Sequence, residues 1–466
     1  MELKGRKVVV LGLGDTGLSM TRWLARHGAD VRVADTRADP PHAARLAREL
    51  PQVPLAAGAF GEGTLRGADL VAISPGLDRR EAPVAEAIER GVPVVGDIEL
   101  FAQALKAGVS RQSSVVTEPK VLAITGSNGK STVTAMAGEI LRAAGRRTVV
   151  AGNIGTPVLD ALCAIEDGAA APEAFVLELS SFQLESTSSL EPAAAVMLNL
   201  TEDHLDRYDS MTDYAAAKAR VFAGGGAQVL NRDDRWSMDM ARAGRSLLTF
   251  GGGAPRTETE WGIRAERGTD VLARGSRPLM ELARLPVAGL HNAANALAAH
   301  ALAHSIGAPD EALARALRSF QGLPHRMQQV AEHEGVIFLD DSKGTNVGAT
   351  VAALAGLQRP AVLIAGGDGK GQDFAPLAPA VKARARAVVL IGRDANKLAQ
   401  AIAGSGVPVE RAAGMDEAVQ AAFRASRAGD AVLLSPACAS YDMFRNYAHR
   451  GEAFAAAVRR LAGSGG

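Results

Sequence analysis

An apolar strand, a glycine-rich turn and a helix follow one another between Lys120 and Gly138, and this stretch constrains the fold most strongly. The run Val121–Ile124 is typical of a buried parallel strand, and the turn TGSNGKST precedes an alanine-rich segment with helical spacing. In such a unit, backbone N–H groups and the positive end of the helix dipole converge where an anion can bind. The sequence therefore predicts a phosphate-binding loop for ATP within an α/β sheet.

The residues of this turn have separate expected roles. Gly126 and Gly129 permit the sharp bend, Lys130 can reach the outer phosphates, and the Ser131 hydroxyl is placed to hold Mg²⁺. Ile124 stands where the strict Walker pattern has its first glycine, so the motif is a shortened variant. The alternative is an ordinary turn that contains Gly-Lys-Ser by chance, and the flanking strand and helix argue against it. We expect the whole loop to bind ATP: Gly126, Ser127, Asn128, Gly129, Lys130, Ser131 and Thr132.

Composition excludes several classes of protein. The 51 basic and 51 acidic residues cancel, so no net charge recruits nucleic acid, and no long apolar run predicts membrane insertion. The two cysteines, Cys163 and Cys438, lie far apart and favour a reducing compartment over a disulfide framework. The chain begins directly with a strand rather than a signal peptide. A length of 466 residues then predicts a cytoplasmic enzyme of several domains.

A second glycine-rich turn lies near the N-terminus. Strand Lys7–Leu11 leads to GLGDTG, a helix to about His27 and a strand that ends at Asp35, which lies 18 positions beyond the last glycine. This G-x-G-x-x-G pattern predicts a Rossmann-like nucleotide site with Asp35 or its neighbours near a ribose or base. The motif leaves an NAD(P) site open as an alternative. The unit is short, about a hundred residues, and shows no acid–base pair suited to hydride transfer.

Two later strands each end in a polar residue. Glu178 closes an apolar run that starts at Phe175, and strand Ala195–Leu200 precedes His204. Parallel strands finish at the same edge of a sheet as the phosphate loop, so both side chains are candidate Mg²⁺ ligands. The alternatives are a structural carboxylate for Glu178 and a capping or core histidine for His204. Histidine is also an unusual ligand for a cation that prefers oxygen.

The remaining segments indicate how the chain divides. Polar residues Gly108–Pro119 predict a linker, and Leu323–Arg326 predicts a second hinge. Residues 224–285 contain short strands and little else that can be interpreted. Asn292 and Asn295 share one face of an alanine-rich helix that runs to about Ile306.

The last third repeats the α/β alternation. Strand ends in DDSKGTN, GGDGKG and SPACASY carry lysines, hydroxyls and backbone amides, which suit a small anion such as an amino-acid carboxylate. Lys343 is the candidate cation. The alternative is a structural ion pair of Lys343 with Asp340 or Asp341.

Taken together, TGSNGKST, LELSSFQLE, NLTEDHLDRY, HNAANALAA, LPHR, DDSKGTN, GGDGKGQDF and SPACASYDMF resemble the Mur ligase family. The similarity runs from the first strand to about residue 454. The first four motifs are shared with folylpolyglutamate ligases. DDSKGTN and SPACASYDMF resemble the branch that adds D-glutamate.

The resemblance implies an ATP-dependent amide ligase of peptidoglycan precursor synthesis that forms an acyl phosphate. It implies three α/β domains: a Rossmann-like N-terminal domain (1–110), a central P-loop ATPase-like mixed sheet (111–324) and a Rossmann-like C-terminal domain (325–466). These would bind UDP-N-acetylmuramoyl-L-alanine, ATP with two Mg²⁺ ions, and D-glutamate, respectively. A monomer is expected.

The resemblance also implies site residues. It places Lys130, Lys218, His204 and Glu178 at the catalytic centre, with Ser131, Glu178, His204 and a carbamylated Lys218 as metal ligands. Further ATP contacts are Asn292, Asn295, Arg326 and Asp341. The UDP-substrate contacts are Gly14, Asp15, Thr16, Asp35, Thr36, Arg37, Ser74, Pro75, Gly76, Asn153, Ser180 and Gln183. D-Glutamate contacts are His204, Lys343, Thr345, Ser440, Tyr441 and Tyr447. Asp15, Tyr441 and Tyr447 depart from the residues common in the family.

Overall fold

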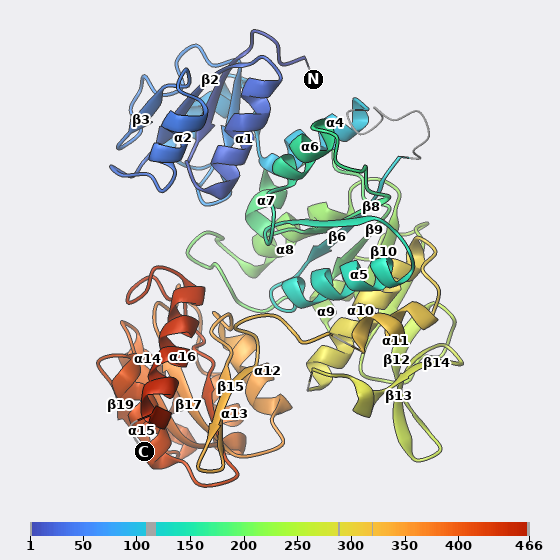
Figure 1. Ribbon diagram of the computed structural model, residues 1–466, viewed down its shortest axis with the longest axis vertical. Coiled ribbons are helices and arrows are strands. Elements are labelled where there is room, and N and C mark those ends of the chain that lie inside the picture. The colour runs from blue at the N-terminus through green and yellow to red at the C-terminus, as the bar shows by residue number, and fades with distance from the viewer. Residues whose placement is uncertain (1, 109–117, 288, 319, 464–466) are drawn as a thin grey trace.

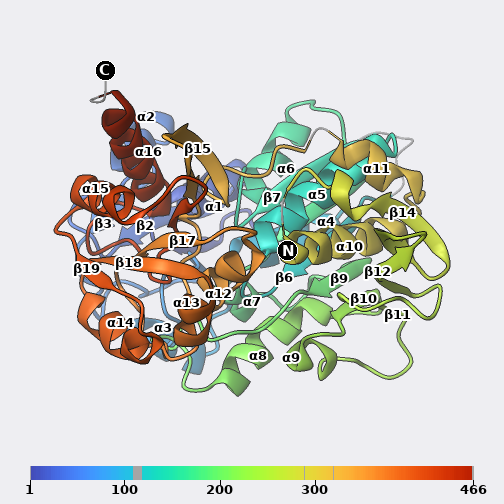
Figure 2. The same cartoon turned by 90° about the horizontal axis from the view of Figure 1, so that it is seen from below.

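Three separate β-sheets organise the chain, each covered by helices (Figure 1). The computed structural model describes residues 2–108, 118–287, 289–318 and 320–463. In Figure 1 the N-terminal sheet is blue, the central sheet runs from cyan to yellow-green, and the C-terminal sheet is orange to red. Figure 2 shows the C-terminal sheet and its helices beside the central domain. The predicted fold class, three α/β domains, is confirmed.

The N-terminal sheet is parallel, in the order β3-β2-β1-β4-β5. The two central strands, β1 and β4, are apolar runs because helices cover both faces. Helix α1 starts directly after the glycine turn, and a Cβ on Gly17 would lie 1.8 Å from the Gly12 carbonyl oxygen. The elements are β1 (Lys7–Leu11), α1 (Asp15–Arg26), β2 (Asp30–Asp35), α2 (Ala43–Glu49), β3 (Leu55–Ala57), β4 (Leu70–Ile73), α3 (Ala82–Glu89), β5 (Val94–Val95) and α4 (Asp97–Lys106).

The central sheet has nine strands in the order β14-β13-β12-β11-β10-β9-β6-β8-β7. Strand β6 carries the phosphate loop and lies between β8 and β9, so the ends of all three strands meet at one edge. Strands β12, β13 and β14 run antiparallel, which makes the sheet mixed as predicted.

The elements of the central domain alternate at first and then form a run of strands. They are β6 (Lys120–Thr125), α5 (Lys130–Ala143), β7 (Thr148–Gly152), α6 (Val158–Glu166), β8 (Ala174–Glu178), α7 (Ser181–Glu185), β9 (Ala194–Met197), α8 (Met211–Ala219), η2 (Arg220–Phe222), β10 (Ala227–Asn231), α9 (Arg235–Met238), β11 (Leu247–Phe250), β12 (Glu260–Glu266), β13 (Thr269–Arg274), β14 (Arg277–Glu281), η3 (Leu282–Arg284), α10 (Leu290–Ser305) and α11 (Glu311–Leu317).

Helix α4 joins the first two domains. It packs against α6, and Phe101 meets Phe175 of β8 edge-on at 5.0 Å between ring centroids. One apolar core therefore continues from the N-terminal sheet into the central domain. Of the predicted linker Gly108–Pro119, residues 109–117 lie outside the described residues.

The C-terminal sheet has the order β15-β16-β20-β17-β18-β19 and is parallel except for β15. Separate apolar clusters cover its two faces. Its elements are β15 (Gln328–His333), β16 (Val336–Asp340), α12 (Val347–Gly356), β17 (Ala361–Gly366), α13 (Leu377–Arg384), β18 (Ala385–Ile391), α14 (Ala395–Ile402), η4 (Ala403–Ser405), β19 (Val409–Arg411), α15 (Met415–Ala425), β20 (Ala431–Leu434) and α16 (Tyr447–Gly463).

One expectation needs correction. The strand expected at Ala195–Leu200 ends at Met197, because the next residues turn to contact the phosphate loop. Helix α8, which carries Lys218, ends at Ala219 and continues as the 3-10 turn η2. Among the described residues, every helix is too short or too polar to traverse a bilayer.

Candidate active site

The phosphate loop is shaped by two glycines with positive φ. Gly126 has φ +152°, and a Cβ there would come within 2.9 Å of the Leu198 Cβ. Gly129 has φ +84°, and a Cβ there would meet Asn295 Oδ1 at 2.6 Å. The end of β9 holds the loop, since Asn199 accepts hydrogen bonds from the backbone N–H groups of Ser127 and Asn128, both at 2.9 Å. Other residues at these glycines would strain the backbone or clash.

Two lysines, the buried Lys218 and the half-buried Lys130, meet at this loop. Lys130 Nζ donates to the carbonyl oxygens of Gly126 (2.8 Å) and Ser127 (2.9 Å), and Lys218 Nζ donates to the same Gly126 oxygen (2.9 Å). Burial lowers the pKa of Lys130, and burial together with the nearby Lys130 charge lowers the pKa of Lys218 well below its usual range. A cationic pocket with so few counter-ions suits a polyanion.

Glu178 lies at the end of β8 beside these lysines. Asn153 Nδ2 donates to its Oε1 at 2.8 Å, while its buried Oε2 has no hydrogen-bond partner in the described structure. An orphaned carboxylate oxygen facing this cluster fits a metal ligand, because Mg²⁺ prefers oxygen. Among the described residues, no three His, Cys, Asp or Glu side chains gather closely enough to hold a metal unaided. A metal here would thus also need the Ser131 hydroxyl and phosphate oxygens.

His204 lies beyond the end of β9 in a left-handed backbone conformation, with φ +58°. Its ring packs 4.7 Å from that of Phe182, and burial lowers the pKa of His204 to about 4. The imidazole is therefore neutral near pH 7 and has a nitrogen lone pair to offer.

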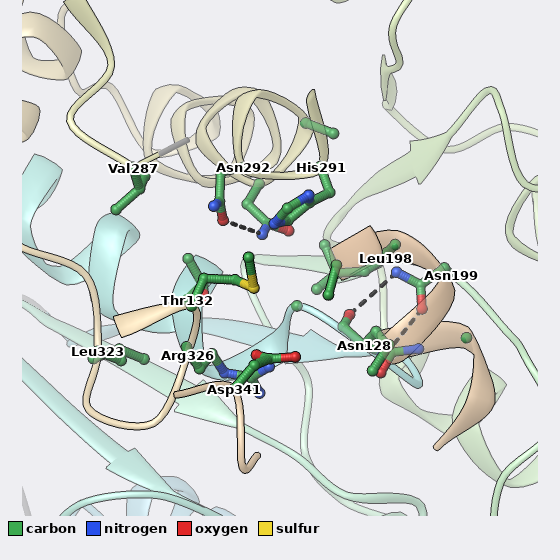
Figure 3. Close-up of a pocket in the computed structure, with 18 of the residues that line it drawn as sticks. Asn128, Thr132, Leu198, Asn199, Val287, His291, Asn292, Leu323, Arg326 and Asp341 are labelled. Atoms are coloured by element: carbon green, nitrogen blue, oxygen red, sulfur yellow. Dashed lines mark hydrogen bonds between the residues drawn. The ribbon is translucent and has the colours of Figure 1, made fainter. Parts of the chain in front are cut away.

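A cavity of about 330 Å³ adjoins the loop and collects the predicted nucleotide contacts. Figure 3 shows Asn292 and His291 on α10 opposite Arg326 and Asp341, with Asn128 to one side. Asn295 Nδ2 donates to Asn292 Oδ1 at 3.2 Å, and Arg326 Nε is buried without a hydrogen-bond partner in the described chain. Burial raises the pKa of Asp341 to about 7. The structure brings together Gly129, Thr132 and these side chains from three segments.

The C-terminal domain reaches the phosphate loop through Lys343. Its Nζ donates to Ser131 Oγ at 2.8 Å and lies 5.2 Å from the Tyr447 ring centroid. Burial lowers the pKa of Lys343 to about 8. Lys343 forms no ion pair with Asp340 or Asp341 in the described structure: Asp340 pairs with His325, and Asp341 accepts from Ser435.

Sequence reasoning missed a polar bridge between the central and C-terminal domains. Lys370 pairs with Asp203 Oδ1, and Asn346 Nδ2 donates to Asp203 Oδ2 (3.1 Å) and to Asn128 Oδ1 (3.1 Å). Burial alone would raise the pKa of Asp203, but the Lys370 charge holds it at about 2. The sequence does carry a signal for Lys370, because this lysine follows a strand end within GGDGKG.

Arg450 was also missed. It is buried on α16 and donates to Ser342 Oγ (3.0 Å), to the Ser342 carbonyl (2.8 Å) and to the Cys438 carbonyl (3.0 Å). It thereby ties the loop that carries Lys343 to the loop that precedes Ser440. Only the tertiary structure reveals this, because arginine in a helix is usually exposed.

The other predicted D-glutamate contacts vary in position. Thr345 lies in the Lys343 loop, and its N–H donates to the Lys343 carbonyl at 3.0 Å. Ser440 is buried, whereas Tyr441 exposes 76% of its surface. Tyr447 starts α16 next to Lys343.

The N-terminal turn lies in a separate region, and its charges are paired internally. Asp35 accepts from the Leu13 N–H (2.6 Å) and from Arg37. Burial would raise the pKa of Asp35, but the Arg37 hydrogen bonds hold it at about 2. Asp15 is exposed and pairs with His42 at 2.8 Å. Gly14 is the N-cap of α1, Thr16 lies in its first turn, and Thr36 follows β2. Ser74 Oγ, just before Pro75 and Gly76, donates to the Gly12 carbonyl (3.1 Å).

Ser180 and Gln183 bond to each other. Ser180 caps α7 by accepting from the Gln183 N–H, and Gln183 returns a bond through its side chain. Gln183 is buried, and its Nε2 donates to Asp97 Oδ2 at 3.1 Å. Ser180 remains partly accessible.

Comparison with known proteins bears on this geometry. Residues 6–96 match the Mur ligase MurD-like N-terminal domain, 124–303 the Mur ligase middle domain and 325–438 the Mur ligase glutamate ligase domain. The UDP-N-acetylmuramoylalanine–D-glutamate ligase of Thiobacillus denitrificans is 58% identical, covering 99% of this chain and 98% of its own. The ligase of the same name from Methylobacillus flagellatus is 56% identical, with 99% and 98% coverage.

Solved structures share the fold at lower identity. The UDP-N-acetylmuramate–alanine ligase of Thermotoga maritima superposes with a TM-score of 0.61 at 20% identity, covering 98% of this chain and 99% of its own. A folylpolyglutamate synthase of Mycobacterium tuberculosis, solved with ADP and AMPPCP, gives 0.55 at 17% identity, with 78% and 95% coverage.

Proposed function

The chain belongs to the Mur ligase family, and from this premise we propose that it joins D-glutamate to UDP-N-acetylmuramoyl-L-alanine in an ATP-dependent step of peptidoglycan precursor synthesis. The two relatives described above carry this activity in their names. One observation supports the proposal most: Lys130, Lys218 and Glu178 converge with the C-terminal Lys343 at a single glycine loop. We expect the protein to catalyse this reaction as a monomer in the cytoplasm.

The proposed reaction explains why cationic side chains gather at the glycine loop. A carboxylate is a poor electrophile and must first become an acyl phosphate. Bringing it to about 4 Å from a phosphate charge costs about 4 kcal/mol at an effective dielectric of 20. Lys130 and Arg326 offset this repulsion and the charge that develops during transfer.

The residues present fit a metal-bound nucleotide. Ser131 Oγ, the orphaned Glu178 Oε2 and the neutral His204 ring would hold Mg²⁺, which supplies further neutralisation of the phosphates when bound. Asn292, Asn295 and Asp341 would orient the nucleoside in the adjoining cavity.

Lys218 fits a carbamate. Only a neutral amine adds to carbon dioxide, and the lowered pKa of Lys218 leaves its amine available near neutral pH. The reaction forms an N–C bond, releases a proton and converts the neutral amine into an anionic oxygen ligand. A second Mg²⁺ would then have a carboxylate-like group from the protein, beside His204.

The C-terminal domain would bring D-glutamate. Lys343, Thr345 and Ser440 lie on loops at the edge that faces the phosphate loop, and their groups suit the substrate carboxylates. Closure about Leu323–Arg326 would keep water from the acyl phosphate. Tyr441 and Tyr447 would lie at the rim.

The N-terminal domain would hold the UDP end of the substrate at Gly14, Thr16 and the Asp35–Arg37 pair. The NAD alternative loses support, because residues 6–96 match the MurD-like N-terminal domain of Mur ligases.

The test is an amino-acid panel in a phosphate-release assay with UDP-N-acetylmuramoyl-L-alanine as acceptor. We expect release with D-glutamate and at least a hundredfold less with L-glutamate, L-alanine or meso-diaminopimelate. Lys130→Ala protein is the blank. Preference for another amino acid would identify a sister ligase, and binding of NADH in place of the UDP-substrate would refute the proposal.

A further inference from the structure

A second cavity, of about 420 Å³, lies where the N-terminal domain meets the central domain. Four arginines line it: Arg79 and Arg80 from the segment after β4, Arg207 from the segment before α8, and Arg220 directly after α8. The proposed ligase reaction uses none of these side chains.

Two of the four arginines are neutralised. Arg80 pairs with Asp78 (2.9 Å) and Asp209 (3.2 Å), and Arg207 pairs with Glu185 (2.8 Å). The second Glu185 oxygen accepts from the Tyr208 hydroxyl at 2.5 Å, so this carboxylate is fully used.

Arg79 and Arg220 are different, because their partners are uncharged. Arg79 Nη1 donates to the Glu185 carbonyl, while Arg220 donates to the carbonyls of Leu184 (2.7 Å) and Thr187 (2.6 Å). Neither forms an ion pair with a carboxylate of the described chain, and Arg79 Nε is buried without a partner there. Burial and the nearby Arg220 charge lower the pKa of Arg79. Asp213, the remaining carboxylate that lines the cavity, accepts from Ser210 Oγ at 2.7 Å, so neither guanidinium has a carboxylate of the described chain as its direct partner.

This cavity is separated from the phosphate loop by α8. Lys218 points from α8 to the Gly126 carbonyl, whereas Ala216 and Ala217 of the same helix line the arginine cavity. The two groups thus use different faces of one helix.

We propose that this cavity binds a phosphoryl dianion between Arg79 and Arg220. A dianion matches two uncompensated guanidinium groups, and the planar N–H fork of arginine suits phosphate oxygens. The bound anion would link the Arg79 segment of the N-terminal domain to the helix that carries Lys218. The inference does not depend on which amino acid the enzyme adds.

The test is titration of inorganic phosphate into full-length Lys130→Ala protein by calorimetry, because that background weakens phosphate binding at the glycine loop. We expect one saturable site. Adding Arg79→Gln should weaken its affinity at least tenfold, and Arg79→Lys, which keeps the charge but not the planar fork, should restore part of it. The matched control Arg80→Gln should change it less than twofold, because that charge is already paired.

Two further arms complete the experiment. Melting curves check that each variant is folded. Titration of ribose 5-phosphate in place of inorganic phosphate shows whether the site binds a phosphate ester or the free ion. Binding of either ligand supports the site. Absence of binding, equal weakening by Arg79→Gln and Arg80→Gln, or complete competition by UDP-N-acetylmuramoyl-L-alanine would overturn the proposal.

Discussion

The two glycine-rich turns of this chain share a strand–turn–helix plan but differ in how they treat charge. At the N-terminal turn, the carboxylate of Asp35 is satisfied by the Leu13 N–H and Arg37. At the central turn, Lys130 and Lys218 bond only to carbonyl oxygens, and Glu178 retains an unpartnered oxygen. At the N-terminal turn the charged groups are satisfied within the protein. At the central turn they lack charged partners, so a bound ligand can supply them.

The largest effect is expected at the central turn. Lys130→Ala should lower kcat for phosphate release at least a thousandfold, because the transferred phosphoryl group loses its nearest cation. Its Tm should not fall, since burial of this lysine opposes its charge. Lys120→Ala, an exposed lysine at the start of β6, is the control. Near-normal turnover of the Lys130→Ala protein would contradict the assignment of this loop as the ATP site.

The second lysine should behave differently. Lys218→Ala should lose at least a hundredfold in kcat and regain part of it in acetate, because a free carboxylate can replace a carbamate oxygen. Mass spectrometry in bicarbonate should show an added carbon dioxide on the wild-type chain. A bare Lys218 amine in the substrate complex would contradict the carbamate.

The central turn also depends on a lysine from another domain. Lys343→Met keeps the stem and removes the charge, so KM for D-glutamate should rise about ten- to a hundredfold, as expected for one charged hydrogen bond of about 1.5–3 kcal/mol. KM for ATP should rise less, although the contact with Ser131 gives it some sensitivity. An unchanged KM for D-glutamate with a lower Tm would indicate a purely structural lysine.

At the N-terminal turn, Asp35→Ala should weaken binding of the UDP-substrate about tenfold and binding of ATP hardly at all. The reason is indirect: the carboxylate holds the Leu13 N–H and Arg37 in place. Calorimetry with each ligand separates the two effects. Equal losses for both ligands would mean that the turns do not serve different nucleotides.

A third carboxylate, Asp97, sharpens the comparison. Asp97 is buried like Asp35 but has only the Gln183 amide and backbone N–H groups as partners, and burial raises its pKa to about 6. The folded state therefore holds the proton more tightly than the unfolded state, so stability is present below about pH 4 and is lost as pH rises through 6. Relative to Asp97→Asn, the wild type should lose at most about 3 kcal/mol across that window. Parallel Tm–pH curves for the two proteins would refute this.

The sequence predicts the structure best where a single strand and the turn after it determine the local fold. The phosphate loop and the strand Lys7–Leu11 follow from local apolar runs and glycines. The roles of the individual site residues stay predictions, as do the domain boundaries.

What the sequence did not reveal depends on distant partners. Short strands are expected in the stretch 224–285, but the bounds and pairing of β10 to β14 are not, because polar and small residues interrupt the apolar pattern on a partly exposed sheet edge. The Asp203–Lys370 pair joins residues 167 positions apart, and Gln183 is buried because α7 packs against Asp97. No local pattern encodes such contacts.

The most direct test follows the carboxylate oxygens of the substrate into the reaction products. UDP-N-acetylmuramoyl-L-alanine with both carboxylate oxygens as ¹⁸O is incubated with ATP and D-glutamate, and the released phosphate is analysed by mass spectrometry. An acyl phosphate requires one ¹⁸O in each phosphate released and one left in the new amide, with no product in Lys130→Ala protein. Phosphate without the label, alongside amide product, would contradict activation of the substrate carboxylate at the central glycine turn.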